Sequence, residues 1–311
     1  MQSKLFACPP VLIGHRGTGR GRSAAGHREN TPEGFAAAAA AGAAWVEMDV
    51  RRAADDVLVV LHDHVLPDGR SADGLTSDEL RQHGVHALDS ILGQLPDGLG
   101  VDLDVKARLD DALRPADRTT GAMVARVAAR IARTRPVLVT AFSPPVLLQS
   151  RAIAPEVPVG LLTPPGVPLR EAVPAAKHLG AIVAAPYVSA FGLPGELAEG
   201  DEVTPEVLGR QVRVARAAGV ELLVWGLGHH QLSSVVARGA DAVCIDEIGL
   251  VPVECPPGQR RTSPAAASSR PSSDRRGSPS QSPSTVTAQE PTATASANAA
   301  TGSAASSSPA R

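Results

Sequence analysis

The chain has 311 residues, of which 43% are hydrophobic and 2% aromatic, and its formal net charge is -2. This near-neutral balance excludes a general polyanion-binding protein, which would be strongly basic. The scarcity of aromatic side chains argues against a base-stacking surface for single-stranded nucleic acid, so we expect no nucleic-acid partner. The three cysteines are too few and too scattered for a disulfide framework or a thiolate zinc site.

The N-terminal segment lacks the features of a secretory leader. The apolar stretch before Cys8 is far shorter than the roughly 7–15 residues of a signal peptide. The segment ending at Cys8 superficially matches a lipoprotein cleavage site, but the residues upstream could not cross a membrane. No apolar run approaches the roughly 20 residues of a transmembrane helix. We therefore expect a cytoplasmic protein, provided that the assigned start does not omit a signal peptide.

The composition shifts sharply after Cys255. Residues 256–311 are mainly Ser, Ala, Pro, Thr and Gly, and Val286 is their only large apolar side chain. Such a segment cannot bury enough apolar surface to offset the entropy of ordering, so we expect a disordered C-terminal tail. Its six Arg and two acidic residues leave it basic. The tail is either a solvated extension, which we favour, or a tether in weak contact with an anionic surface.

Before the tail, strand-like and helix-like segments alternate. Thr31-Pro32-Glu33 supplies an N-cap, a proline at the first helical position and an early acid, and Gly42 closes that predicted helix. Near-continuous apolar runs separated by helices predict a parallel sheet covered by helices. Eight such runs predict the α/β class and a closed (β/α)8 TIM barrel. The runs are residues 11–14, 45–51 with 57–62 as a returning arm, 101–106, 136–142, 157–162, 181–187, 221–227 and 240–246.

Polar residues end several of these predicted strands. In a barrel, catalytic groups lie at the carboxyl ends of the strands and in the loops that follow. Alternation along a strand puts Glu47 and Asp49 on one face, and likewise Asp104 and Lys106. The residues concerned are His15 and Arg16 after the first strand, Glu47 and Asp49 on the second, His62 and Asp63 after its returning arm, and Asp104 and Lys106 on the third.

These residue types point to a cation and to proton transfer. Three acids facing one barrel interior would repel each other and resist burial unless a cation compensates. Oxygen-only ligands suit Mg²⁺ or Ca²⁺. Histidine is the candidate for general acid–base work near neutral pH. Taken alone, the Glu47–Asp49 pair is more typical of a solvated strand edge, and Lys106 could simply neutralise Asp104; the combination favours a functional site.

The order of the motifs resembles the glycerophosphodiester phosphodiesterase family. The matching motifs are His15-Arg16-Gly17, Glu29-Asn30-Thr31, Glu47-x-Asp49, His62-Asp63 and Asp104-x-Lys106. The resemblance covers about residues 9–252, which we take as the barrel domain, with residues 256–311 as the tail. It implies a (β/α)8 barrel that hydrolyses glycerophosphodiesters to sn-glycerol 3-phosphate and an alcohol, using one divalent cation.

The resemblance also implies roles for individual residues. His15 and His62 would be the catalytic acid–base pair, and Arg16 and Lys106 would bind the phosphate. One histidine would deprotonate an attacking hydroxyl and the other would protonate the leaving alcohol. The implied metal ligands are Glu47, Asp49 and Asp104, and Glu29 and Asn30 would support the His15 loop and the site.

Departures from the family pattern keep other interpretations open. Asp104 replaces the family's usual Glu, and Gly226 and Gly228 follow Trp225 where the family favours Thr and Asn. One alternative is a catalytically degenerate barrel that acts as a binding or interaction module. Another is a different metal-dependent barrel enzyme, such as a lyase acting on a carbonyl substrate.

Overall fold

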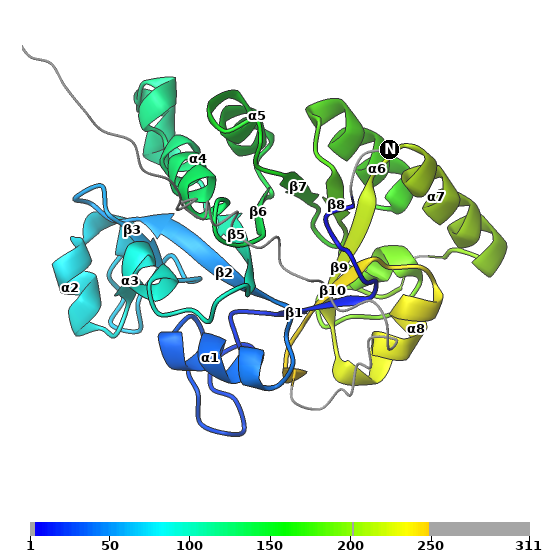
Figure 1. The fold of residues 1–311 in the computed structure, drawn as a ribbon, viewed down its shortest axis with the longest axis horizontal. Helices are drawn as coiled ribbons and strands as arrows, with labels where there is room; N and C mark the ends of the chain where they lie inside the picture. The colour runs from blue at the N-terminus through cyan, green and yellow to red at the C-terminus, as the bar shows by residue number, and fades with distance from the viewer. Residues whose placement is uncertain (1–3, 201, 249–311) are drawn as a thin grey trace, which may run out of the picture. The chain divides into compact units, whose positions relative to one another are not determined.

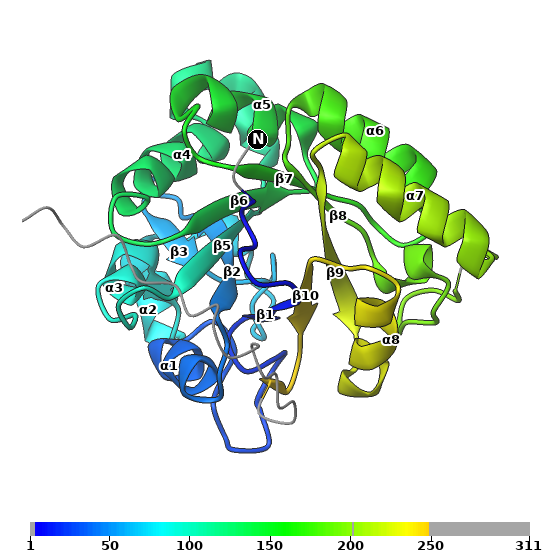
Figure 2. The ribbon, with the colours of Figure 1, turned by 45° about the vertical axis from the view of Figure 1, so that its right-hand side comes forward.

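In the computed structural model, which describes residues 4–200 and 202–248, eight parallel strands close into a barrel (Figures 1 and 2). The first strand pairs with the second on one side and with the last on the other, which completes the ring. Each predicted run overlaps one of these strands, so the (β/α)8 prediction is confirmed. The strands are β1 (Val11–Gly14), β2 (Trp45–Arg52), β5 (Gly100–Val105), β6 (Val137–Ala141), β7 (Val159–Leu162), β8 (Val183–Ala185), β9 (Glu221–Leu227) and β10 (Ala242–Ile245).

Helices lie around the outside of the ring (Figure 2). They are α1 (Pro32–Ala40), α2 (Ser77–Gln82), α3 (Leu88–Leu92), α4 (Thr120–Ile131), α5 (Pro144–Ile153), α6 (Leu169–Leu179), α7 (Pro205–Ala217) and α8 (Leu232–Ala237). The Thr31 side chain accepts a hydrogen bond from Gly34 N at 3.2 Å, as its predicted N-cap role requires. Within the described ranges, no helix has the length and apolar character that a membrane crossing needs.

Short strands and 3-10 helices lie in several of the segments that follow the barrel strands. Two antiparallel strands, β3 (Leu58–Val60) and β4 (His86–Ala87), extend the sheet from β2, so the predicted returning arm is confirmed. The 3-10 helices are η1 (Ala72–Gly74), η2 (Leu109–Leu113), η3 (Ala116–Arg118), η4 (Val188–Phe191) and η5 (His229–Gln231). The predicted tail, residues 256–311, lies outside the described residues.

Inside the barrel, apolar side chains form one layer, and polar side chains form a second layer nearer the carboxyl ends of the strands. Trp45, Glu47 and Asp49 alternate with outward-facing residues along β2, so all three point inward. Phe6, which precedes β1, packs edge-on against Trp45 with ring centroids 5.8 Å apart. A Cβ on Gly100 would lie 2.2 Å from the Trp45 ring, so only glycine fits beside it on β5. The inward carboxylates therefore sit above a packed apolar floor, towards the carboxyl ends of the strands.

Candidate active site

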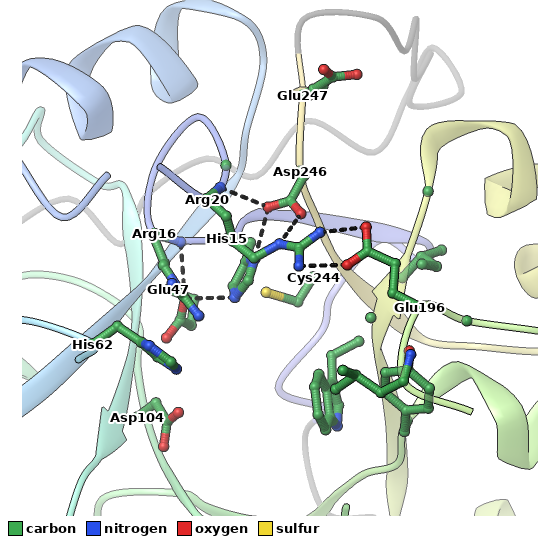
Figure 3. Close-up of a pocket in the computed structure, with 18 of the residues that line it drawn as sticks. His15, Arg16, Arg20, Glu47, His62, Asp104, Glu196, Cys244, Asp246 and Glu247 are labelled. Carbon is green, nitrogen blue, oxygen red and sulfur yellow. Dashed lines mark hydrogen bonds and ion pairs between the residues drawn. The ribbon is translucent and has the colours of Figure 1, made fainter. Parts of the chain in front are cut away.

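A cavity of about 1010 Å³ opens at the carboxyl ends of the strands (Figure 3). Charged side chains from the loop after β1, from β2 and from β5 and the residue after it line one wall. Aromatic side chains from β9 and from the segments after β6 and β8 line another wall. The lining includes seven of the nine predicted site residues, namely His15, Arg16, Glu47, Asp49, His62, Asp104 and Lys106; Glu29 and Asn30 lie behind them.

Three buried carboxylates meet at the base of the charged wall. One ligand oxygen from each of Glu47, Asp49 and Asp104 lies within 4.8 Å of the others, and these residues are 6%, 1% and 6% exposed. Burial, together with the charges of Asp49 and Asp104, raises the pKa of Glu47 well above its ordinary value. Asp104 Oδ1 is buried and has no hydrogen-bond partner among the described residues. This donor set, with one oxygen unsatisfied, fits a hard divalent cation.

Lys106 lies between two of these acids. Its Nζ is 2.9 Å from Asp49 Oδ1 and also contacts Asp104 Oδ2. Burial raises the pKa of Asp49, but the charges of Lys106 and Arg16 outweigh it and hold that pKa below its usual range. Burial lowers the pKa of Lys106, yet the neighbouring carboxylates raise it overall, so the ammonium stays charged. Lys106 therefore shares its single positive charge between Asp49 and Asp104.

The loop after β1 holds Arg16 against the acids. Arg16 N donates to Glu47 Oε2 at 2.9 Å, its Nη1 donates to Glu29 at 3.2 Å, and its Nε lies 3.3 Å from Asp49. Asn30 Nδ2 donates to Asp49 Oδ2 at 2.8 Å, and Asn30 N donates to the Arg16 carbonyl at 2.9 Å. Glu29 therefore contacts the loop after β1, and Asn30 contacts both that loop and Asp49. The family resemblance gives both residues a supporting role at these places.

Glycine is required at the turn that follows Arg16. Gly17 has a φ of 93°, and a Cβ there would lie 2.8 Å from the Gly34 carbonyl carbon at the start of α1. A side chain at this position would be strained and would push the loop away from the helix. This close approach explains why the third residue of the His-Arg-Gly motif is glycine.

Both predicted histidines reach the cavity (Figure 3). His15 Nδ1 lies 2.8 Å from Asp246 Oδ1, while its Nε2 is 4.0 Å from Glu47. His62 follows β3, and its Nδ1 lies 2.8 Å from Asp63 Oδ1. Each ring therefore engages an aspartate through Nδ1, which leaves Nε2 for another group.

Asp246 and Asp102 are among the acids of this cavity that sequence reasoning missed. Asp246 directly follows β10, and that position at the carboxyl end of a barrel strand was the signal for it. Asp102 shares its face of β5 with Asp104 and accepts a hydrogen bond from Thr140 Oγ1 at 2.8 Å. Burial raises the pKa of Asp102 to about 8, although the Thr140 hydrogen bond opposes the shift. Strand alternation could have identified Asp102 as a second inward acid of β5.

The aromatic wall explains one departure from the family pattern. Trp225 packs edge-to-face on Phe142 and Tyr187, with ring centroids 5.6 Å and 4.8 Å apart. Gly226 has a φ of 75°, and a Cβ there would lie 2.0 Å from the Tyr187 ring. The Thr that the family favours at this position would therefore collide with Tyr187, whereas glycine leaves room for the Tyr187 ring.

Known structures share this barrel. A glycerophosphodiester phosphodiesterase from Thermotoga maritima is 22% identical with a TM-score of 0.59, covering 78% of this chain and 96% of that one. A phosphodiesterase from Oleispira antarctica, solved with the product sn-glycerol-3-phosphate, is 22% identical with a TM-score of 0.57, covering 77% and 94%. A glycerophosphodiester phosphodiesterase from Parabacteroides distasonis is 19% identical with a TM-score of 0.58, covering 77% and 93%. At these identities the likeness establishes the fold.

The family assignment comes from a comparison of the sequence itself. A search of curated protein sequences finds no significant match. Residues 15–250, in contrast, match the model of the glycerophosphoryl diester phosphodiesterase family. This match includes every predicted site residue and more than half of the chain. The chain belongs to the glycerophosphoryl diester phosphodiesterase family.

Proposed function

We propose that this phosphoric diester hydrolase converts glycerophosphodiesters to sn-glycerol 3-phosphate and an alcohol, with His15 and His62 as the proton-transfer pair and a divalent cation as cofactor. The observation that carries the proposal is the convergence of two histidines, three buried carboxylates and two basic side chains on one cavity. The product bound to the Oleispira antarctica phosphodiesterase supports the same substrate class.

The cation, Mg²⁺ or Ca²⁺, would be held by Glu47, Asp49 and Asp104. When bound, it supplies electrostatic stabilisation of the charge that gathers on the phosphate oxygens. Asp104 is shorter than the family's Glu by one methylene. Its unpartnered Oδ1 nevertheless remains directed among buried groups and available as a ligand.

Arg16 and Lys106 would bind the phosphate. Both are positively charged, and both lie beside the carboxylate cluster rather than in open solvent. A positive group that is held in place and shielded from solvent stabilises developing negative charge more strongly than water does. Lys106 must loosen its contact with Asp104 or Asp49 to reach a phosphate, and a cation on those acids would release it.

The two histidines divide the proton transfers. One ring Nε2 removes the proton of the attacking hydroxyl, and the other ring donates a proton to the leaving alcohol oxygen. The attacking group is either water or, as the family resemblance implies, a hydroxyl of the substrate's own glycerol, which would give a cyclic phosphate for water to open. Nδ1 of each ring is occupied by an aspartate, so Nε2 is the atom that can act.

The test is release of glycerol 3-phosphate from a panel of glycerophosphodiesters, with Mg²⁺, with Ca²⁺ and with chelator. We expect release that depends on the cation. Cation binding without any release would favour the degenerate binding module. Absence of both cation binding and turnover would refute the proposal, and turnover restricted to carbonyl substrates would favour the lyase alternative.

We propose a barrel domain over residues 9–252 with a separate tail over residues 256–311, a cytoplasmic location, and no nucleic-acid partner. The basic composition of the tail supports at most a weak contact with an anionic surface.

A further inference from the structure

Asp246 links His15 to a chain of charged contacts across the mouth of the cavity (Figure 3). It is the first residue after β10 and lies 231 positions from its partner His15 in the sequence. His62 has an equivalent partner in its immediate neighbour Asp63. The fold therefore gives His15 the same kind of contact that the local sequence gives His62.

We propose that Asp246 is the positioning residue of His15: it accepts a hydrogen bond from Nδ1–H and so fixes the ring orientation and the tautomer whose unprotonated Nε2 faces the cavity. A neutral imidazole carries one donor and one acceptor nitrogen, and an ionised carboxylate can only accept. The 2.8 Å contact at Nδ1 therefore assigns the proton to that nitrogen. The inference rests on the proposed proton-transfer role of His15.

The surroundings of Asp246 keep it ionised. Burial raises the pKa of Asp246, but hydrogen bonds and charges from His15 and Arg20 outweigh burial and hold it below its usual range. Arg20 Nε donates to Oδ2 at 2.8 Å, and Arg20 N donates to Oδ1 at 3.1 Å. The carboxylate therefore presents Oδ1 to His15 while Arg20 holds Oδ2.

Arg20 is itself held from the opposite side of the cavity mouth. Its Nη1 and Nη2 donate to the two carboxylate oxygens of Glu196 at 2.6 Å and 2.8 Å. The loop that carries Glu196 is anchored to the barrel because Leu197 N donates to the Tyr187 hydroxyl at 2.8 Å. Contacts from the loops after β8 and β1 thus fix the direction in which the Asp246 carboxylate points.

The first test is the tautomer of His15 in the wild-type protein loaded with Mg²⁺. Ring ¹⁵N chemical shifts report which nitrogen carries the proton, and His15→Gln assigns the signal. We expect a protonated Nδ1 and an unprotonated Nε2 when the ring is neutral. A neutral ring protonated at Nε2 would overturn the proposal without any variant of Asp246.

The second test is kinetic. In Asp246→Asn, the amide keeps one acceptor oxygen, for which the charged Arg20 Nε competes with His15 Nδ1–H and the Arg20 backbone N–H. When Nε takes the oxygen, the NH₂ group faces His15 and disfavours the Nδ1–H tautomer. We expect kcat to fall by about 10²–10⁴-fold with little change in KM. Of the two ion pairs that Arg20→Ala removes, only the one with Asp246 touches a partner of His15, so this variant alone should cost less than about fivefold in kcat. The double variant should be more active than Asp246→Asn, because the freed amide can turn its oxygen to His15.

The matched control is Glu247→Gln, which neutralises the next residue, a carboxylate 3.6 Å from His229 rather than on His15. Its kcat should stay within about twofold of wild type. Near-wild-type kcat in Asp246→Asn, or a lost kcat with an unchanged His15 tautomer, would overturn the inference. Full activity in His15→Gln would instead refute the proposed function on which the inference rests.

Discussion

Addition of Mg²⁺ or Ca²⁺ to chelator-treated protein should raise its thermal stability. Glu47, Asp49 and Asp104 bring three carboxylates together, and the charges of Lys106 and Arg16 compensate only two of them. In the metal-free protein, burial and the other two acids raise the pKa of Glu47, so protons compete with the cation for this carboxylate. Cation binding should therefore strengthen as pH rises.

The expected size follows from mass action. At a cation concentration 100 times its Kd, binding adds about 2.7 kcal/mol to the free energy of unfolding. For a domain of this size, each 1 kcal/mol shifts Tm by roughly 2–4 °C, so we expect a rise of about 5–11 °C. Scanning calorimetry in chelator, Mg²⁺ and Ca²⁺, at pH 5.5 and pH 8, measures both the shift and its pH dependence.

Two variants sharpen this experiment. Asp49→Asn should reduce the shift sharply, because it replaces one of the three proposed carboxylate ligands with a neutral amide. Asp78→Asn, which neutralises an exposed acid on α2 paired with Arg81, should keep the full shift. Identical melting curves with and without cation, together with no metal detected in the protein by elemental analysis, would refute the reasoning.

The remaining predictions concern pH, packing and the tail. Burial raises the pKa of Asp102 in the folded protein to about 8, so the stability of the wild type falls as pH rises from about 4 to 8. In chelator, Asp102→Asn should therefore melt about 3 °C or more above wild type at pH 8, but not at pH 4. Gly226→Ala should cost at least about 2 kcal/mol in denaturant unfolding, because its Cβ would meet the Tyr187 ring. Gly98→Ala, with a φ of 74° against 75° and nothing within 4 Å of its Cβ, should cost about 1 kcal/mol. Equal costs would contradict the packing argument. Deletion of residues 256–311 should leave a cooperative melt and full activity, and aggregation of the truncated protein would contradict it.

Strand alternation made the charged wall predictable. The period-2 pattern of β2 fixes Glu47 and Asp49 on one face, and the pattern of β5 adds Asp104 and Lys106 to the same interior. Because adjacent parallel strands pair in register, Asp49 and Asp104 are direct cross-strand neighbours. Local sequence thus contains most of the information that assembles the cluster.

Contacts between distant loops could not be predicted in the same way. The ion pair of Arg20 with Glu196 joins residues 176 positions apart, and no local pattern links them. The position of Lys106 between Asp49 and Asp104 depends on side-chain rotamers and on the charge balance of the closed barrel. The glycine at position 226 departed from the family pattern for a reason that only the position of Tyr187 reveals.

The most direct test of the central claim is the rate of sn-glycerol 3-phosphate release in a histidine series. With Mg²⁺ and a glycerophosphodiester substrate, His15→Gln and His62→Gln should each lose about 10²–10⁴-fold in kcat at unchanged Tm. His229→Gln, which alters a histidine of the same cavity that pairs with Glu247, should stay close to wild type. Near-full activity in either of the first two variants, or a comparable loss in His229→Gln, would contradict the assignment of the catalytic pair.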